Sequence, residues 1–196
     1  MPTGTARLSD NFLRNRVYGF AMKKRMWSSG ILVSALSLSS LTSSFAAAPV
    51  TSAKGSHGEV ITASSVKIAS GAAITVRGTN FDETVGIYLA FCLIPAAGSL
   101  PTPCGGGVNM SGTGDASYWI SSNPPPYGVG VAQPFLAGGR FTKRMHLSYL
   151  IKTPDGKILA DCKKVACAIT IRADHLRESD RNYDIFLPIT FISPKK

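Results

Sequence analysis

The sequence predicts an all-β fold, a seven-stranded immunoglobulin-like antiparallel sandwich. Short β-branched and aromatic runs alternate with turn residues (Gly, Pro, Asn and Asp), and no segment keeps a helical period. The four cysteines form two close pairs in sequence, Cys92 with Cys104 and Cys162 with Cys167. An even number of cysteines downstream of an export signal is typical of a disulfide framework.

Seven segments carry the strand pattern: residues 66–69, 73–78, 86–93, 117–121, 141–151, 166–172 and 184–192. Alternation of apolar and polar residues is visible in several of them, for example at Ile87, Leu89 and Phe91. Residues 153–157 read Thr-Pro-Asp-Gly-Lys, a strong turn signal between the 141–151 strand and the segment that leads into Cys162.

The amino-terminal part predicts secretion. Residues 22–27 contain the three bases of a positively charged opening, residues 31–41 form an apolar run, and Ser44 and Ala46 offer small residues for cleavage after Ala46. A retained membrane anchor is the alternative, but the apolar run is shorter than the roughly 18 residues that a spanning helix needs. Because residues 1–21 precede the basic opening, we interpret them as a mis-assigned extension and Met22 as the true start.

The predicted organisation is therefore an extension at 1–21, a signal peptide at 22–46, a flexible leader at 47–63 and the sandwich at 64–193. Six bases and one acid precede residue 47, so the mature part keeps 21 − 6 = 15 bases against 11 − 1 = 10 acids, a net charge of +5. This charge lies within the ordinary range of small soluble domains. Nucleic acid is disfavoured as a partner because the bases are scattered and no recognition motif accompanies them.

Four stretches resemble the neocarzinostatin-like family of secreted actinobacterial apoproteins. They are Ala-Ala-Pro at 47–49, Gly-Ala-Ala-Ile-Thr-Val-Arg-Gly-Thr-Asn-Phe at 71–81, residues 88–92 leading to a second cysteine, and Ala-Asp-Cys-Lys-Lys-Val-Ala-Cys at 160–167. From the residues alone, four cysteines allow three pairings. The resemblance implies the local pairs Cys92–Cys104 and Cys162–Cys167, a seven-stranded sandwich, and a cleft that carries a hydrophobic chromophore.

The chain departs from this family by a longer region between residues 93 and 139. This region contains Pro124–Pro126, which we expect in a polyproline II conformation, flanked by Trp119, Tyr127 and Phe135. We predict Tyr127, Phe135 and Trp119 as ligand-binding residues. The alternative is that Trp119 fills the core and that the prolines protect a sheet edge.

We find no catalytic constellation and predict that the protein is not an enzyme. Disulfides would occupy all four cysteines, and the three histidines (His57, His146 and His175) lie in no catalytic or zinc motif. The acidic segment that contains Asp174, His175, Glu178, Asp180 and Asp184 offers oxygen ligands for a metal. Interleaved arginines favour a solvated, neutralised connection instead, so we predict neither a metal site nor a cofactor.

Two function classes remain. The first is a secreted carrier, a monomer that sequesters a hydrophobic small molecule in a cleft. The second is an envelope interaction domain that recognises a protein, an anionic glycan or a host surface through aromatic and basic loops. The basic residues considered for that role are Arg140, Lys143, Arg144, Lys163 and Lys164.

Overall fold

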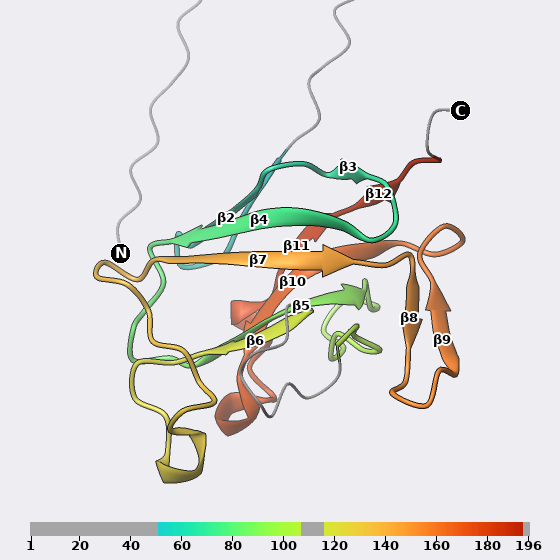
Figure 1. Cartoon of the computed structure of the whole chain (residues 1–196). Coiled ribbons are helices and arrows are strands. Elements are labelled where there is room, and N and C mark those ends of the chain that lie inside the picture. The colour runs from blue at the N-terminus through green and yellow to red at the C-terminus, as the bar shows by residue number, and fades with distance from the viewer. Residues whose placement is uncertain (1–50, 107–115, 194–196) are drawn as a thin grey trace, which may run out of the picture. The chain divides into compact units, whose positions relative to one another are not determined.

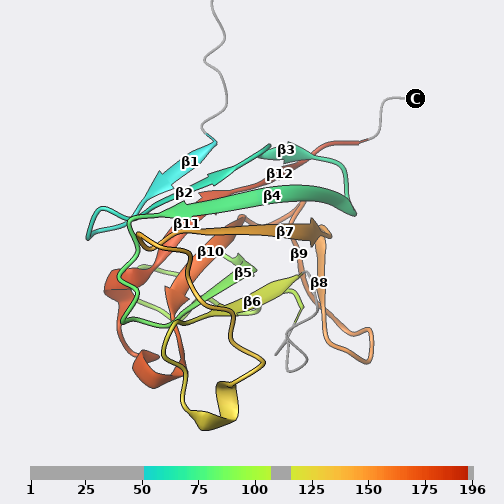
Figure 2. The same ribbon diagram turned by 60° about the vertical axis from the view of Figure 1, so that its left-hand side comes forward.

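The computed structural model describes residues 51–106 and 116–193 of the chain. Two four-stranded antiparallel sheets form the fold and lie in two layers (Figures 1 and 2). The first sheet has the order β1 (Ser52–Lys54), β2 (Val60–Ala63), β4 (Ala72–Thr79) and β7 (Phe141–Leu147). The second sheet has the order β11 (Ile185–Pro188), β10 (Cys167–Ala173), β5 (Ile87–Leu93) and β6 (Ser117–Ile120).

Two smaller ribbons complete the described part of the fold. Strand β3 (Lys67–Ile68) pairs in parallel with β12 (Thr190–Phe191), and β8 (Leu150–Lys152) pairs antiparallel with β9 (Ile158–Asp161). Three short 3-10 helices lie in connections: η1 (Pro126–Gly128), η2 (His175–Arg177) and η3 (Arg181–Tyr183). The loop with η1 lies at the end of the second sheet away from the β8–β9 ribbon (Figures 1 and 2).

The core lies between the sheets and follows the period of two that strands impose. Ile61 and Val76 of the first sheet and Leu89 and Ile169 of the second are 0% exposed, and all belong to one buried cluster. Space there is tight, because a Cβ atom on Gly78 would lie 2.1 Å from Cε1 of Phe141. Layered packing of this kind supplies most of the stability of a sandwich.

The structure confirms the predicted all-β antiparallel sandwich with two local disulfides, Cys92–Cys104 and Cys162–Cys167. The predicted turn at 153–157 is also confirmed. The N–H group of Thr153 donates to the carbonyl of Lys157 at 2.9 Å, and Gly156 takes a positive φ of 90°. A glycine adopts that conformation without the steric cost that a Cβ atom adds.

The prediction of a flexible leader at 47–63 is wrong for its described part. Residues 52–63 form the β1–β2 hairpin and pair with β4, and Ile61 is completely buried. Only one large apolar residue of β2 enters the core, so the segment lacked the repeated alternation that marks a strand. The predicted segments 1–21 and 22–46 lie outside the described residues.

Two predicted long strands are each divided, and the strand expected before Cys162, which was not among the seven counted, is present as β9. The 141–151 segment leaves the first sheet after Leu147 and continues as β8 in another ribbon. The 184–192 segment changes sheets at Ile189, whose N–H donates to Cys167 while the next N–H, that of Thr190, donates to Val66. Apolar alternation continues through both changes of partner, which is why the sequence pattern concealed them.

The polyproline prediction holds only in part. Pro125 has the extended angles φ −61° and ψ 165°, whereas Pro126 begins η1. Proline suits the first position of a helical turn because its fixed φ matches and its missing N–H group would have no partner there.

We predict that Ile61→Ala lowers the free energy of unfolding by about 2–4 kcal/mol, the usual cost of a large-to-small change in a core. Thr62→Ala, on the exposed side of the same strand, is the matched control and should change it by less than about 0.5 kcal/mol. Urea unfolding of both variants measures the difference. Equal, small effects would show that residues 60–63 do not belong to the core.

Candidate functional site

The structure brings two of the three predicted binding residues together, Trp119 and Tyr127, and places the third, Phe135, in the core. Trp119 is half-buried on β6, and Tyr127 is 65% exposed in η1. Their rings stack with centroids 6.4 Å apart. Phe135 is only 7% exposed and packs on Phe81 in the core, so a ligand reaches it only by displacing core side chains.

Trp119 and Tyr127 form one cluster with two residues that the sequence analysis did not propose for binding, Tyr88 and His175. We call these four side chains the aromatic–histidine cluster. Tyr88 lies directly opposite Trp119 in the β5–β6 register, and their ring centroids are 6.2 Å apart. Because the neighbouring Ile87 points into the core, Tyr88 and Trp119 share the outer face of the second sheet.

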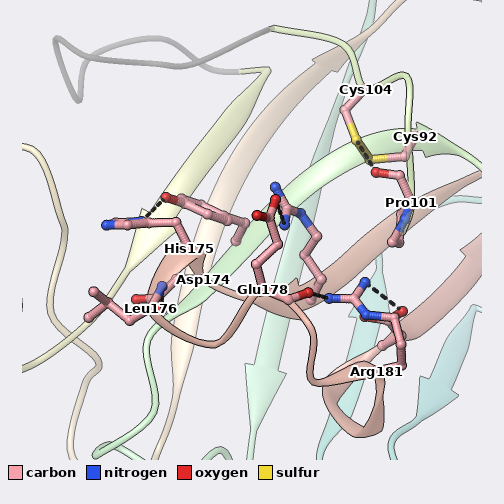
Figure 3. Close-up of polar contacts among 11 residues, drawn as sticks. Cys92, Pro101, Cys104, Asp174, His175, Leu176, Glu178 and Arg181 are labelled. Carbon is pink, nitrogen blue, oxygen red and sulfur yellow. Dashed lines mark hydrogen bonds and ion pairs between the residues drawn. A yellow bond between two sulfur atoms is a disulfide. The ribbon is translucent and has the colours of Figure 1, made fainter. Parts of the chain in front are cut away.

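His175 joins the cluster through both nitrogens of its ring. The hydroxyl of Tyr88 lies 2.5 Å from Nδ1, and the hydroxyl of Tyr127 lies 2.8 Å from Nε2. The histidine ring also meets Trp119 edge to face, with centroids 5.0 Å apart. Figure 3 shows His175 in the connection after β10, next to Asp174.

These contacts leave a hydrogen-bond donor for a further partner. A neutral imidazole has one N–H donor and one acceptor nitrogen, so it donates to one tyrosine and accepts from the other. The tyrosine that accepts from His175 keeps its own O–H hydrogen. The cluster therefore combines aromatic area with a phenolic donor that an oxygen or nitrogen acceptor of a ligand can use.

The buried carboxylate of Asp174 holds the base of the cluster. Its Oδ2 accepts from Nε1–H of Trp119 at 3.0 Å, and its Oδ1 accepts from the N–H of Leu176 at 3.0 Å. A Cβ atom on Gly86 would lie 2.0 Å from Oδ2, so glycine is needed for this close approach. Since Asp174 is only 2% exposed, solvent competes little for these bonds.

Gly128 supports Trp119 from the side of η1. A Cβ atom at Gly128 would lie 2.4 Å from Cη2 of the indole, which leaves no room for a larger residue. The indole is thus fixed by a hydrogen bond to its nitrogen and by close backbone packing against its six-membered ring. A ring held in this way loses little conformational entropy when a ligand stacks on it.

Tyr88 remains a neutral phenol at physiological pH. Burial raises the pKa of Tyr88, the carboxylate of Asp174 raises it further, and the Arg172 guanidinium opposes both. The guanidinium carbon lies 5.0 Å from the Tyr88 ring centroid, and Nη1 lies 3.7 Å from Oε1 of Glu178. Tyr88 therefore supplies a hydrogen-bonding hydroxyl and not a nucleophilic phenolate.

The acidic residues near the cluster serve as caps and ion-pair partners. Asp174 and Asp180 accept backbone N–H groups at the starts of η2 and η3, and Asp184 pairs with Arg181 at 3.1 Å. Among residues 51–106 and 116–193, no group of three or more potential metal ligands occurs. The same described residues contain no helix long and apolar enough to cross a membrane.

Three of the five basic residues considered for surface recognition already contact other side chains of the domain. Lys143 hydrogen-bonds the side chain of Gln133, and burial lowers the pKa of Lys143. Lys163 lies over the ring of Tyr149, 4.1 Å from its centroid, and Lys164 pairs with Asp161 at 3.7 Å.

A separate cavity of about 180 Å³ lies between β5, the end of β7 and β8. Apolar side chains line part of it, including Phe91, Leu147 and Ile151, and Lys152 contributes a polar group. Pockets for drug-sized ligands usually measure about 300–1,000 Å³. This cavity has room for a small group but not for a molecule of that size.

Taken together, the fold and the site define a disulfide-linked β-sandwich with a preformed aromatic surface. No known protein family and no curated protein matches the sequence. Among solved structures, macromomycin, an apoprotein of the neocarzinostatin family, is similar with a TM-score of 0.43 and 15% identity. The similarity covers 69% of this chain and 100% of macromomycin.

We predict that Asp174→Ala loosens Trp119. The indole N–H group loses its buried partner, so the free energy of unfolding should fall by about 1–3 kcal/mol and Trp119 emission should shift to the red. Asp180→Ala is the matched control, since it removes the cap of η3 without touching Trp119. Unchanged emission in Asp174→Ala would contradict the anchoring role.

Asp184 should make stability depend on pH. Burial raises the pKa of Asp184 from 3.8 to about 6 in the folded state, so the folded chain binds this proton more tightly than the unfolded chain. The resulting stabilisation is complete below pH 3.8 and is lost as the pH rises through about 6. Asparagine cannot lose this proton, so the stability of Asp184→Asn relative to the wild type should increase as the pH rises from 3.8 to about 6. Urea unfolding at several pH values measures the difference.

Asp82 provides the control of opposite sign, because hydrogen bonds from Thr84 lower the pKa of Asp82. Its stabilisation is present above its unfolded pKa and is lost on acidification. Asp82→Asn should lose stability relative to the wild type as the pH rises from acid to neutral. The same direction of change in both variants would contradict the assignment.

Proposed function

We propose that this chain is a secreted, non-catalytic binding domain whose aromatic–histidine cluster holds a hydrophobic, ring-bearing small molecule. The observation that carries the proposal is the 65% exposed ring of Tyr127 stacked on the fixed indole of Trp119. Aromatic side chains that are held in place and partly exposed are the groups that commonly bind ligands by stacking.

The ligand should be flat and should carry a hydrogen-bond acceptor. A flat ring can stack against Tyr127 and Trp119, while an acceptor meets the O–H hydrogen of Tyr127, the more exposed of the two phenols. The two disulfides fit an oxidising, extracytoplasmic compartment, which supports secretion. No cysteine remains free, so the chain offers no thiol nucleophile.

The ligand surface differs from the cleft that the family resemblance implies. The cavity of about 180 Å³ is too small for a large chromophore. The cluster lies on the open outer face of the sheet, so its ligand can extend beyond it into solvent. Carriage would then depend on stacking and one or two hydrogen bonds.

The test is a fluorescence titration of the mature protein with 2-acetonaphthalene, an aryl ketone, read from Trp119. A fragment of this size should bind with a dissociation constant of about 1 mM. Tyr127→Ala should weaken binding about fivefold through the lost stacking, and Tyr127→Phe should weaken only the ketone and not 2-ethylnaphthalene, which lacks the acceptor.

Leu159→Ala is the control, because Leu159 is an exposed apolar residue on β9. It should leave the affinity unchanged, and the melting temperature of Tyr127→Ala should stay within a few degrees of the wild type. Equal loss of affinity in the Leu159 and Tyr127 variants would exclude the cluster as the binding site.

A further inference from the structure

The outer face of the first sheet carries a second, chemically different surface. The side chains of Ile61, Val76 and Met145 point into the core, so the alternate residues of β1, β2, β4 and β7 point outward. The paired registers place the following residues on this outer polar face: Ser52, Lys54, Val60, Thr62, Ala73, Thr75, Arg77, Thr79, Thr142, Arg144 and His146. All of them are exposed except Val60 and Thr75, which are half-buried.

The outer polar face has positive charge and no acidic residue. It contains Lys54, Arg77 and Arg144. Within residues 51–106 and 116–193, ion pairs join other bases to carboxylates, but none involves these three side chains. Their charges are therefore available to an external anion, and salt should screen that attraction.

Strand pairing arranges the three charges in a diagonal band. Arg77 lies opposite Thr142 and Arg144 lies opposite Thr75, so the two arginines are diagonal neighbours on adjacent strands, about 8 Å apart at their backbones. Lys54 pairs with Val60, which pairs with Thr79 of β4, two residues from Arg77. Lys54 and Arg77 are therefore about 12 Å apart at their backbones. A linear chain with an acidic group on every one or two sugar units can match such spacings.

The other side chains of the face suit hydroxylated sugars. Thr62, Thr75, Thr79 and Thr142 supply hydroxyl groups that both donate and accept hydrogen bonds. The face carries no Phe, Tyr or Trp, and His146 is its one aromatic ring, whereas proteins that bind single-stranded nucleic acids stack successive bases on several aromatic side chains.

We propose that the outer polar face binds a linear acidic polysaccharide, with its carboxylate groups on Lys54, Arg77 and Arg144 and its hydroxyls on the threonines. This surface lies on the sheet opposite to the one that carries the aromatic–histidine cluster. Binding here therefore does not depend on the proposed small-molecule function, and either can fail alone.

The test measures binding of alginate oligosaccharides, a polyuronate probe, to the mature protein by calorimetry at about 50 mM salt. Arg77→Gln/Arg144→Gln should weaken binding about tenfold, since each exposed charge contributes a modest share. Lys157→Gln/Lys164→Gln removes the same charge from the β8–β9 turn and the Cys162–Cys167 turn, and should change the affinity less than twofold. Amide shifts in the NMR spectrum should change on β4 and β7 and not on β10.

Several outcomes would overturn the proposal. They are absence of alginate binding, equal binding of neutral dextran, equal losses in the two double variants, and shifts confined to the second sheet. Tighter binding of single-stranded DNA than of alginate, with the same sensitivity to the arginine variant, would identify a nucleic-acid surface instead.

Discussion

The buried carboxylate of Asp174 is the constraint on which the aromatic–histidine cluster depends. It fixes the indole of Trp119 on β6 and begins η2, so it also determines where His175 lies. The hydroxyls of Tyr88 and Tyr127 then meet the two nitrogens of that histidine. Four rings from separate segments are thereby held in one arrangement before any ligand arrives, which is the condition for binding at a low entropic cost.

The two sheets give the domain two outer faces with different chemistry. The second sheet presents aromatic rings where β5 and β6 pair, whereas the first presents threonines and three bases that form no ion pair within the described part of the chain. Both faces follow from the same alternation that fills the core, because each strand that buries one set of side chains exposes the other. Our two proposals assign a small molecule to one of these faces and an acidic polysaccharide to the other.

The fold class could be predicted because it depends on local signals, the turn residues and the short alternating runs that are visible in the chain. The disulfide pairing was implied only by the family resemblance, since the residues alone allow three pairings. The β1–β2 hairpin escaped prediction because Ile61 is its only large core residue. The changes of sheet after Leu147 and at Ile189 cannot be seen in the sequence, because the alternation of apolar and polar residues continues unbroken through both of them.

The site could be predicted only where one residue was informative by itself. The sequence led us to propose Tyr127 and Trp119. Tyr88 lies beside Trp119 because of the β5–β6 register, and His175 lies there because of the connection after β10, and neither placement is visible in the sequence. Phe135 looked equivalent to Tyr127 in sequence, yet it packs on Phe81, and only the folded chain distinguishes the two.

The most direct measurement follows the NMR signals of the Trp119 indole and the Tyr127 ring while 2-acetonaphthalene is added. We expect these signals to shift together and saturate, while those of Leu147 and Ile151 in the cavity stay in place. Shifts of the cavity signals alone, or of none of the four residues, would contradict the claim that the aromatic–histidine cluster is the binding surface.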